Sequence, residues 1–264
     1  ISENIVNLFK ESKTFKDYGN ARVGLDTGNN NKFIRFWFEV NKEKIVLNAK
    51  SKEYVFDHEY KWVPHTKGGS YRKWYGNLEH IIAFDKENYN SLLESGNKLP
   101  SREYYFLEGF NWSRISTTKF AVRYTPVGTV FNSVSPTAFV KKDDLVFFIS
   151  FMNTKVVSYL LQLINPTMHF EAGNINVLPI KYDINFEIKK RIEDLGNSCI
   201  EISKNEWDSF EVSWDFKYLP LLAYKESLRI ETALEQLNQY KEEQINSIRA
   251  NEEEINRIFS EIYC

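Results

Sequence analysis

The spacing of apolar residues changes along the chain, and each change predicts a different kind of element. Residues 3–11 gather their apolar side chains on one side of a helix that Ser2 would cap. Residues 33–40 and much of 100–140 alternate in steps of two, which is typical of strands. We expect these segments to form a twisted, mostly antiparallel sheet.

The apolar period becomes helical after Asp144. Residues 145–165 predict two buried helical segments, broken near Asn153 and Thr154. Residues 224–263 contain neither glycine nor proline and predict a long helical segment, whose apolar seam is interrupted by Lys241. Such a seam favours a packed helical hairpin, or a helix docked on another domain, over a free coiled coil.

These patterns together predict an α+β fold, a twisted and mostly antiparallel sheet with packed helices, followed by a long C-terminal helical segment. We assign residues 1–182 to the sheet domain and 183–264 to a helical spacer or docking region. The chain has 264 residues, of which 42% are hydrophobic and 16% aromatic, so it can bury a sizeable core.

The cysteines and the first residues indicate the compartment. Cys199 and Cys264 are the only cysteines, which fits a reducing cytoplasm and excludes a disulfide framework or a cysteine zinc site. No run of 18 or more apolar residues and no secretory leader is present, so we expect a cytoplasmic protein with no membrane contact. Ile1 opens the chain without a methionine, and we interpret the sequence as a piece of a longer protein.

The formal net charge of −2 conceals a charge polarity. Residues 61–142 hold twelve Lys/Arg against six Asp/Glu, a local net charge of +6. Residues 228–264 hold four Lys/Arg against eight Glu, a local net charge of −4. An overall pI near 6.2 argues weakly against nucleic acid, but a basic middle and an acidic tail are compatible with a charged groove.

Several common chemistries lack their sequence motifs. There is no GxxxxGK[ST], no GxGxxG after a strand and no HExxH, and the four histidines have no ligand-like spacing, so we predict no metal site. Asp57, Glu59 and Lys61 form a short nuclease-like pattern, but the two acids lie too close together for the usual arrangement on two strands. We predict no catalytic residue.

Two stretches combine cations with aromatic residues. KWVPHTKGGSYRKWYGN, residues 61–77, has four cations, two tryptophans, two tyrosines and three glycines without one carboxylate. A buried strand would not carry such charges, so the stretch is expected to meet water or a polar partner. NWSRISTTKFAVRY, residues 111–124, repeats this composition. One interpretation is a solvated hairpin; the other is a nucleic-acid surface, where cations supply affinity and aromatic groups and amides supply fit.

On the second interpretation, cations contact backbone and bases, glycine amides approach a phosphate, and Asn77, Ser116 and Asn30 are polar readers. Arginine favours guanine edges and asparagine favours adenine. Trp74 is expected to anchor its loop from behind. Alternatively, several of the cations pair with Glu79, Glu103 or Glu108. The predicted DNA-binding residues are Lys67, Gly68, Gly69, Arg72, Lys73, Asn77, Arg114, Ser116, Lys119, Arg123 and Asn30.

Several sequence blocks carry a family resemblance. GLDTGNNNKFIRFWFEV, PHTKGGSYRKWYGN, REYYFLEGFNWSRIS, KFAVRYTPVGTVFN, FMNTKVVSYLLQLINPTMHFEAGNINVLPI, WDSFEVSWDF and NEEEINRIF resemble the C-terminal half of the PglX family. These are adenine-specific DNA methyltransferases of BREX phage-defence systems, similar to type IIG restriction-modification enzymes. The resemblance implies a target-recognition domain with its following helices, downstream of a catalytic domain that uses S-adenosylmethionine to methylate adenine at N6.

The chain departs from that family where catalysis is concerned. The catalytic Asn-Pro-Pro-Tyr motif and the glycine-rich cofactor loop are missing, and Asn165-Pro166-Thr167-Met168 matches only the first two motif residues. We therefore expect this fragment to be no enzyme, to bind no cofactor and to be monomeric. The implied partners are double-stranded DNA, the parent's own methyltransferase domain and other defence-system subunits. The alternative is a protein-interaction module that docks those subunits or a phage-encoded DNA mimic.

Overall fold

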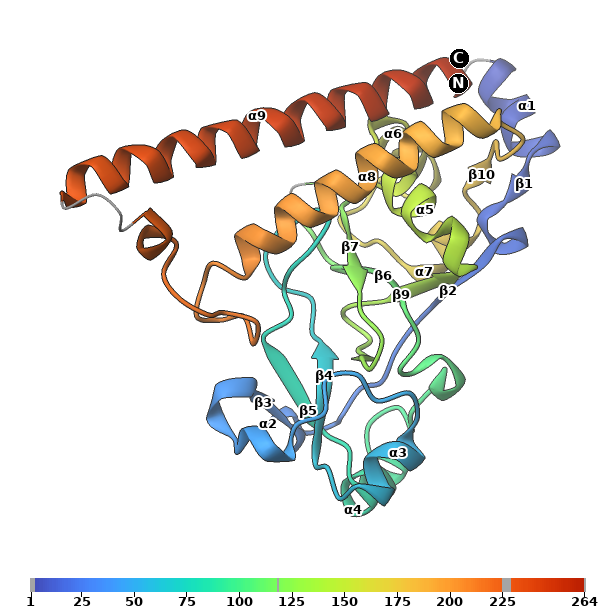
Figure 1. Ribbon diagram of the computed structural model, residues 1–264. Helices are drawn as coiled ribbons and strands as arrows, with labels where there is room; N and C mark the ends of the chain where they lie inside the picture. The colour runs from blue at the N-terminus through green and yellow to red at the C-terminus, as the bar shows by residue number, and fades with distance from the viewer. Residues whose placement is uncertain (1–2, 118, 225–228, 264) are drawn as a thin grey trace.

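A computed structural model describes residues 3–117, 119–224 and 229–263, and these residues confirm the α+β prediction. Ser2, the expected cap of the first helix, and Cys264 lie outside the described residues. The chain forms two lobes, each built on one four-stranded sheet, with the long helices over one of them (Figure 1).

The first sheet has the strand order β2-β9-β6-β7, and every neighbouring pair is antiparallel. A short ladder of β1 with β10 lies beside it. The strands of this lobe are β1 (Lys13–Thr14), β2 (Gly19–Arg22), β6 (Gly109–Trp112), β7 (Val122–Thr125), β9 (Thr137–Val140) and β10 (Pro179–Ile180). The helices of the same lobe are α1 (Glu3–Glu11), α5 (Leu145–Met152), α6 (Lys155–Ile164), α7 (Ala172–Asn176), α8 (Phe186–Trp207) and α9 (Ile230–Tyr263).

The second sheet has the order β3-β5-β4-β8, and only its β4–β8 pair is parallel. It lies in the lower lobe of Figure 1, with α3 and α4 at the bottom. The elements of this lobe are α2 (Asn30–Phe33), β3 (Ile34–Phe36), α3 (Lys52–Asp57), β4 (Trp62–Thr66), β5 (His80–Ala83), α4 (Lys86–Glu94) and β8 (Val130–Phe131). The described residues also form short 3₁₀ helices: η1 (Phe15–Asp17), η2 (Trp37–Glu39), η3 (Lys42–Lys44), η4 (Arg102–Tyr104), η5 (Lys142–Asp144) and η6 (Pro220–Tyr224).

The predicted break between two buried helices is confirmed. The Thr154 hydroxyl caps α6 by accepting a hydrogen bond of 3.3 Å from the backbone N–H of Val157. Almost the whole of α5 is buried, since it packs between the first sheet and the long helices. A helix that is apolar on all sides is stable only where other parts of the protein surround it.

The predicted helical hairpin is also confirmed. Helices α8 and α9 run antiparallel along each other in Figure 1, and Asn251 Nδ2 donates to Ser198 Oγ between them at 3.0 Å. Ile255 and Phe259 of α9 enter the core of the first sheet, whereas Leu234 and Ile245 are exposed. The apolar residues of the seam are therefore buried mainly in the second half of α9. The division of the chain at residue 182 stays a prediction.

The strand predicted at residues 33–40 is much shorter than expected. Asn29 Oδ1 accepts from the Lys32 N–H, so the asparagine run starts a helical turn that includes Phe33. At the other end Glu39 accepts from the Phe36 N–H and closes a 3₁₀ turn. Local side-chain caps thus replace strand pairing on both sides of β3. The strands predicted within 100–140 are confirmed, although each spans only two to four residues.

In the described part of the chain, no single helix is long and apolar enough to cross a membrane. The segments Lys142–Met152 and Lys155–Ile164 have the length and composition only as a pair, with a bend of 76° between them.

Candidate nucleic-acid interface

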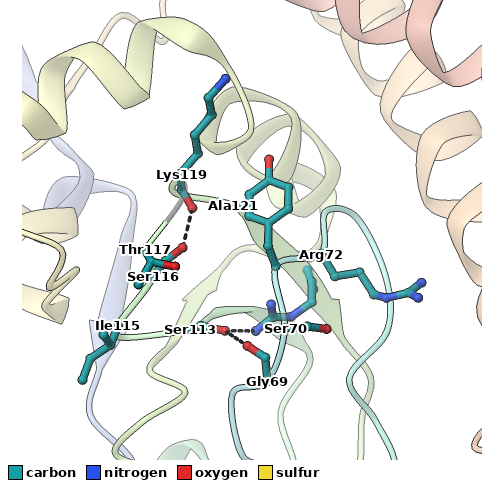
Figure 2. Close-up of a pocket in the computed structure, with 11 residues that line it drawn as sticks. Gly69, Ser70, Arg72, Ser113, Ile115, Ser116, Thr117, Lys119 and Ala121 are labelled. Atoms are coloured by element: carbon teal, nitrogen blue, oxygen red, sulfur yellow. Dashed lines mark hydrogen bonds between the residues drawn. The ribbon is translucent and has the colours of Figure 1, made fainter.

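The two cation-rich stretches meet at one cleft. It lies where the loop after β4 faces the loop between β6 and β7, and its volume is about 220 Å³ (Figure 2). The Ser113 hydroxyl joins the two sides by donating to the Gly69 carbonyl at 3.2 Å. The described residues that line the cleft are Gly69, Ser70, Tyr71, Arg72, Ser113, Ile115, Ser116, Thr117, Lys119, Ala121 and Arg123.

The expectation that residues 61–77 meet solvent is wrong for most of the stretch. Strand β4 is buried throughout, and Trp74 is only 1% exposed, while Gly69–Tyr71 form the exposed tip. The cations lie outside this strand, because Lys61 precedes its first residue, Trp62, and Lys67 follows its last residue, Thr66. The predicted anchoring role of Trp74 is confirmed, since its ring joins the core of the first sheet.

Two of the predicted cations are paired with the acidic helices. The Arg72 guanidinium forms an ion pair with Glu206 on α8, and it stacks over the Trp207 ring with 5.0 Å to the centroid. Lys73 Nζ lies 2.8 Å from Glu252 Oε2 on α9. In Figure 2 the Arg72 side chain accordingly points away from Ser113 and Gly69. Of these two pairs, the one between Lys73 and Glu252 joins the basic middle of the sequence to its acidic tail.

Arg114 is paired as well. Its Nε donates to Glu171 Oε1 at 2.8 Å, in the turn before α7. The partners expected from sequence were wrong, because the ion pairs formed by Arg72, Lys73 and Arg114 use none of Glu79, Glu103 and Glu108. These ion pairs join segments far apart in sequence, so proximity along the chain did not identify the partner carboxylates.

Arg123 is the most buried of the predicted cations, with 1% exposure. Its guanidinium donates from Nη2 to Asn111 Oδ1 at 2.9 Å and to Ser113 Oγ at 3.3 Å. Burial lowers the pKa of Arg123 to about 10, with Arg72 adding repulsion and Glu79 opposing it, so the group stays protonated at neutral pH. Its side chain forms part of the cleft lining.

Lys119 and Lys67 differ from the paired cations, since neither forms an ion pair with any residue that the structure describes. Lys119 is exposed at the cleft, and in Figure 2 its side chain extends away from Gly69 and Ser113. The Lys119 carbonyl accepts from the Ser116 hydroxyl at 3.1 Å. Lys67 is half-buried just after β4, outside the cleft lining.

The glycines and Asn77 shape the loop. Gly68 and Gly69 have φ of +78° and +116°, which only glycine adopts readily. A Cβ on Gly69 would lie 2.8 Å from Asn77 Nδ2. Asn77 is 6% exposed and donates from Nδ2 to the Ser70 carbonyl at 2.9 Å, so its amide holds the loop.

Asn30 lies apart from the cleft. It begins α2 on the second lobe, where its Oδ1 accepts from the Thr27 hydroxyl at 2.7 Å, and it does not line the cleft. The structure therefore joins Gly69, Arg72, Ser116, Lys119 and Arg123 in one lining, and the other predicted residues lie outside it: Lys67, Gly68, Lys73, Asn77, Arg114 and Asn30. The DNA-binding role of all these residues stays a prediction.

The residues of the two remaining motifs do not line the cleft. Asn165, which matches the first residue of the methyltransferase motif, ends α6 and donates to the His169 carbonyl at 2.9 Å and to Asn174 at 3.2 Å. Its amide donors are therefore used within this turn. Asp57 ends α3, and among the described residues no group of three or more His, Cys, Asp or Glu is arranged to hold a metal ion.

Sequence reasoning missed much of the lining, including Ser70, Tyr71 and Thr117. These residue types are common on surfaces, and only the meeting of two loops makes them neighbours. It also missed Glu206 and Glu252 as ion-pair partners. The one signal that could have found Glu252 is the acidic character of residues 228–264, opposite in sign to the middle of the chain; Glu206 lies outside that segment.

Known proteins similar to this chain include an adenine-specific methyltransferase PglX from Lacticaseibacillus casei (strain Zhang). It is 34% identical over 257 residues, and the match covers 92% of this chain and 21% of PglX. The chain is homologous to a part of PglX. The adenine-specific methyltransferase BrxX from Escherichia coli O9:H4 (strain HS) is 35% identical over 210 residues, covering 78% of this chain and 16% of BrxX. The expected family resemblance is confirmed, and the chain spans about a fifth of these relatives or less.

The fold comparison agrees with this result. The type IIL restriction-modification enzyme MmeI, solved in complex with DNA, matches with a TM-score of 0.50 at 12% identity. The match covers 94% of this chain and 36% of the MmeI chain, so the fold resemblance extends over both lobes and the long helices. No family model matches the chain.

Proposed function

We propose that this chain is the DNA target-recognition region of a PglX-type adenine-specific DNA methyltransferase of a phage-defence system. The observation that carries the proposal is the cleft itself, because the two cation-rich stretches are about forty residues apart in sequence yet line one cavity that has no carboxylate in its described lining. A cationic cavity bordered by glycine amides and hydroxyls suits a polyanion.

The known proteins that resemble this chain also support the proposal. PglX and BrxX are named as adenine-specific methyltransferases, and MmeI was solved with DNA bound. A segment that matches about a fifth of such a protein, without its catalytic motif, is suited to choosing the site rather than to transferring the methyl group. The parent would bind S-adenosylmethionine through residues outside this chain.

Binding to DNA tests the proposal. Fluorescence anisotropy with a labelled duplex should give saturable binding that weakens as salt rises, because cation–phosphate contacts release counterions. Calorimetry with S-adenosylmethionine on the same preparation should give no saturable heat. No duplex binding at low salt, in a sample that melts cooperatively, would refute a DNA-binding role.

The second candidate function is a protein-docking module, and the exposed apolar side chains around η6 and the first half of α9 favour it. Tyr218, Leu219, Leu222, Ile230 and Ile245 are all more than half exposed. The two functions are compatible, since this surface and the cleft share no lining residue. Capture of purified methyltransferase domain by the chain, abolished by Leu222→Ser with Ile245→Ser, would support docking; DNA binding should survive these changes.

A further inference from the structure

The guanidinium of Arg123 is buried without an ion pair to any residue that the structure describes. Among the described residues no carboxylate oxygen lies within ion-pair distance, 4.0 Å, of Arg123. Glu79 acts on it only from farther away, and Glu79 Oε1 itself lies 3.4 Å from His80 Nδ1. An arginine buried to this degree is normally paired, because desolvating a lone charge is costly.

The donors of Arg123 are also incompletely used. The hydrogen bonds to Asn111 and Ser113 come from Nε and Nη2, at 2.9 to 3.3 Å. Nη1 makes no hydrogen bond to the described residues, and it is not among the fully buried atoms that lack a partner. Nη1 is therefore not wholly covered by protein, and Arg123 is among the residues that line the cleft. A forked guanidinium with free donors matches the oxygens of a phosphate group.

The size and lining of the cleft restrict the class of ligand that it can bind. Its volume of about 220 Å³ is below the ~300–1,000 Å³ of pockets for drug-sized molecules, so it accommodates one tetrahedral anion rather than a whole nucleotide. Hydroxyls of Ser70 and Thr117 and the exposed Lys119 complete a lining whose described members include no acid.

We propose that this cleft is an oxyanion site in which Arg123 holds a single phosphodiester group of duplex DNA. The proposal rests on the DNA-recognition function, since the source of the phosphate is the DNA backbone. Arg123 would fix the position of the duplex without reading a base, unlike the exposed Lys119 at the rim, which contributes general attraction.

The test avoids replacing Arg123, because that side chain also ties Asn111 to Ser113. Thr117→Glu instead adds a negative charge at the exposed edge of the cleft, and Asn7→Glu on exposed α1 is the matched control. Sodium phosphate, compared with sodium chloride at equal ionic strength, should raise the Tm of the wild type and of Asn7→Glu but not of Thr117→Glu. Phosphate should also displace duplex DNA from the wild type more than chloride does at equal ionic strength. Thr117→Glu should bind duplex DNA on the order of tenfold more weakly than the wild type does.

The outcomes separate the two claims. If the wild type binds duplex DNA, phosphate and chloride act alike, and Thr117→Glu binds as Asn7→Glu does, the oxyanion site is refuted while DNA recognition stands. If phosphate raises the Tm through the cleft but no duplex binds, the site takes free anions, and the DNA source is refuted together with the proposed function. Melting curves of all variants in chloride confirm that each is folded.

Discussion

Trp74 Nε1 donates a hydrogen bond of 2.7 Å to Glu252 Oε1, joining a loop of the sheet domain to the last helix across 178 residues. The other oxygen of the same carboxylate lies 2.8 Å from Lys73 Nζ. One glutamate on α9 therefore holds both the aromatic anchor of the loop beside the cleft and a cation next to it. The acidic tail is part of the architecture of the candidate interface.

Glu252→Ala should lower the free energy of unfolding by about 1–3 kcal/mol, because it leaves the buried Trp74 N–H without an acceptor. Glu252→Gln keeps an acceptor and loses only the partly exposed ion pair to Lys73, so it should cost less than about 1 kcal/mol. Urea unfolding measures both. The control is Glu261→Ala on the same helix, whose pair with Arg257 is exposed. Equal losses for Glu252→Ala and Glu261→Ala would contradict the bridging role.

His65 should make stability depend on pH. It is fully buried between the Val130 carbonyl, 2.9 Å from Nδ1, and Asn132 Nδ2, 3.2 Å from Nε2, so Nδ1 carries the proton and Nε2 accepts. Burial lowers the pKa of His65 to about 3, with repulsion from His80 and Lys67 adding to it. The unfolded state, with a pKa near 6.5, then binds the proton first.

The contribution of His65 is therefore complete above about pH 6.5 and is lost progressively as the pH falls toward 3. Urea unfolding between pH 8 and pH 4 should show this fall, and His65→Gln should flatten it while lowering stability at pH 8. His58→Gln, at an exposed position, serves as the control and should keep the wild-type slope. An unchanged pH dependence in His65→Gln would show that other groups cause it.

Lys67 and Lys119 should carry the salt dependence of DNA binding, because the structure leaves them outside ion pairs while Arg72, Lys73 and Arg114 are paired. Lys67→Ala with Lys119→Ala should weaken binding to all duplexes alike and reduce the log–log salt slope by roughly one per lost contact. Lys10→Ala with Lys16→Ala removes the same charge from exposed positions on α1 and η1. Anisotropy at four salt concentrations compares them; identical slopes for the two double variants would place the DNA elsewhere.

The isolated chain should be a monomer at micromolar concentration. The inner half of the α9 seam is already buried in the chain's own core, as Ile255 with 1% exposure shows. Ile255→Ser would therefore unfold the protein rather than report on association. Leu234→Ser with Ile245→Ser alters the exposed half instead, and sedimentation velocity should give the same monomer peak with and without it. A wild-type dimer that this double change dissociates would contradict the prediction.

Sequence periodicity predicted what depends on local patterns. The helices around Thr154 and the long α9 were predictable because their apolar period and breaks are strong, whereas Phe33 was misassigned to a strand because the Asn29 cap wins locally. The burial of Arg123 was not predictable, since its neighbours Asn111 and Ser113 come from the adjacent strand and loop. Composition marked the two stretches, but only the fold could reveal that they share one cleft.

The central claim is that this region selects the DNA site of a larger methyltransferase, and methylome sequencing tests it most directly. Cells would carry either the intact parent gene or a chimera in which residues 1–182 are replaced by the matching segment of the 34% identical PglX relative. We predict N6-methyladenine at one sequence motif for the parent, and a shift to the motif of the PglX donor in the chimera. A chimera that still methylates, but at the parent's own motif, would contradict the claim.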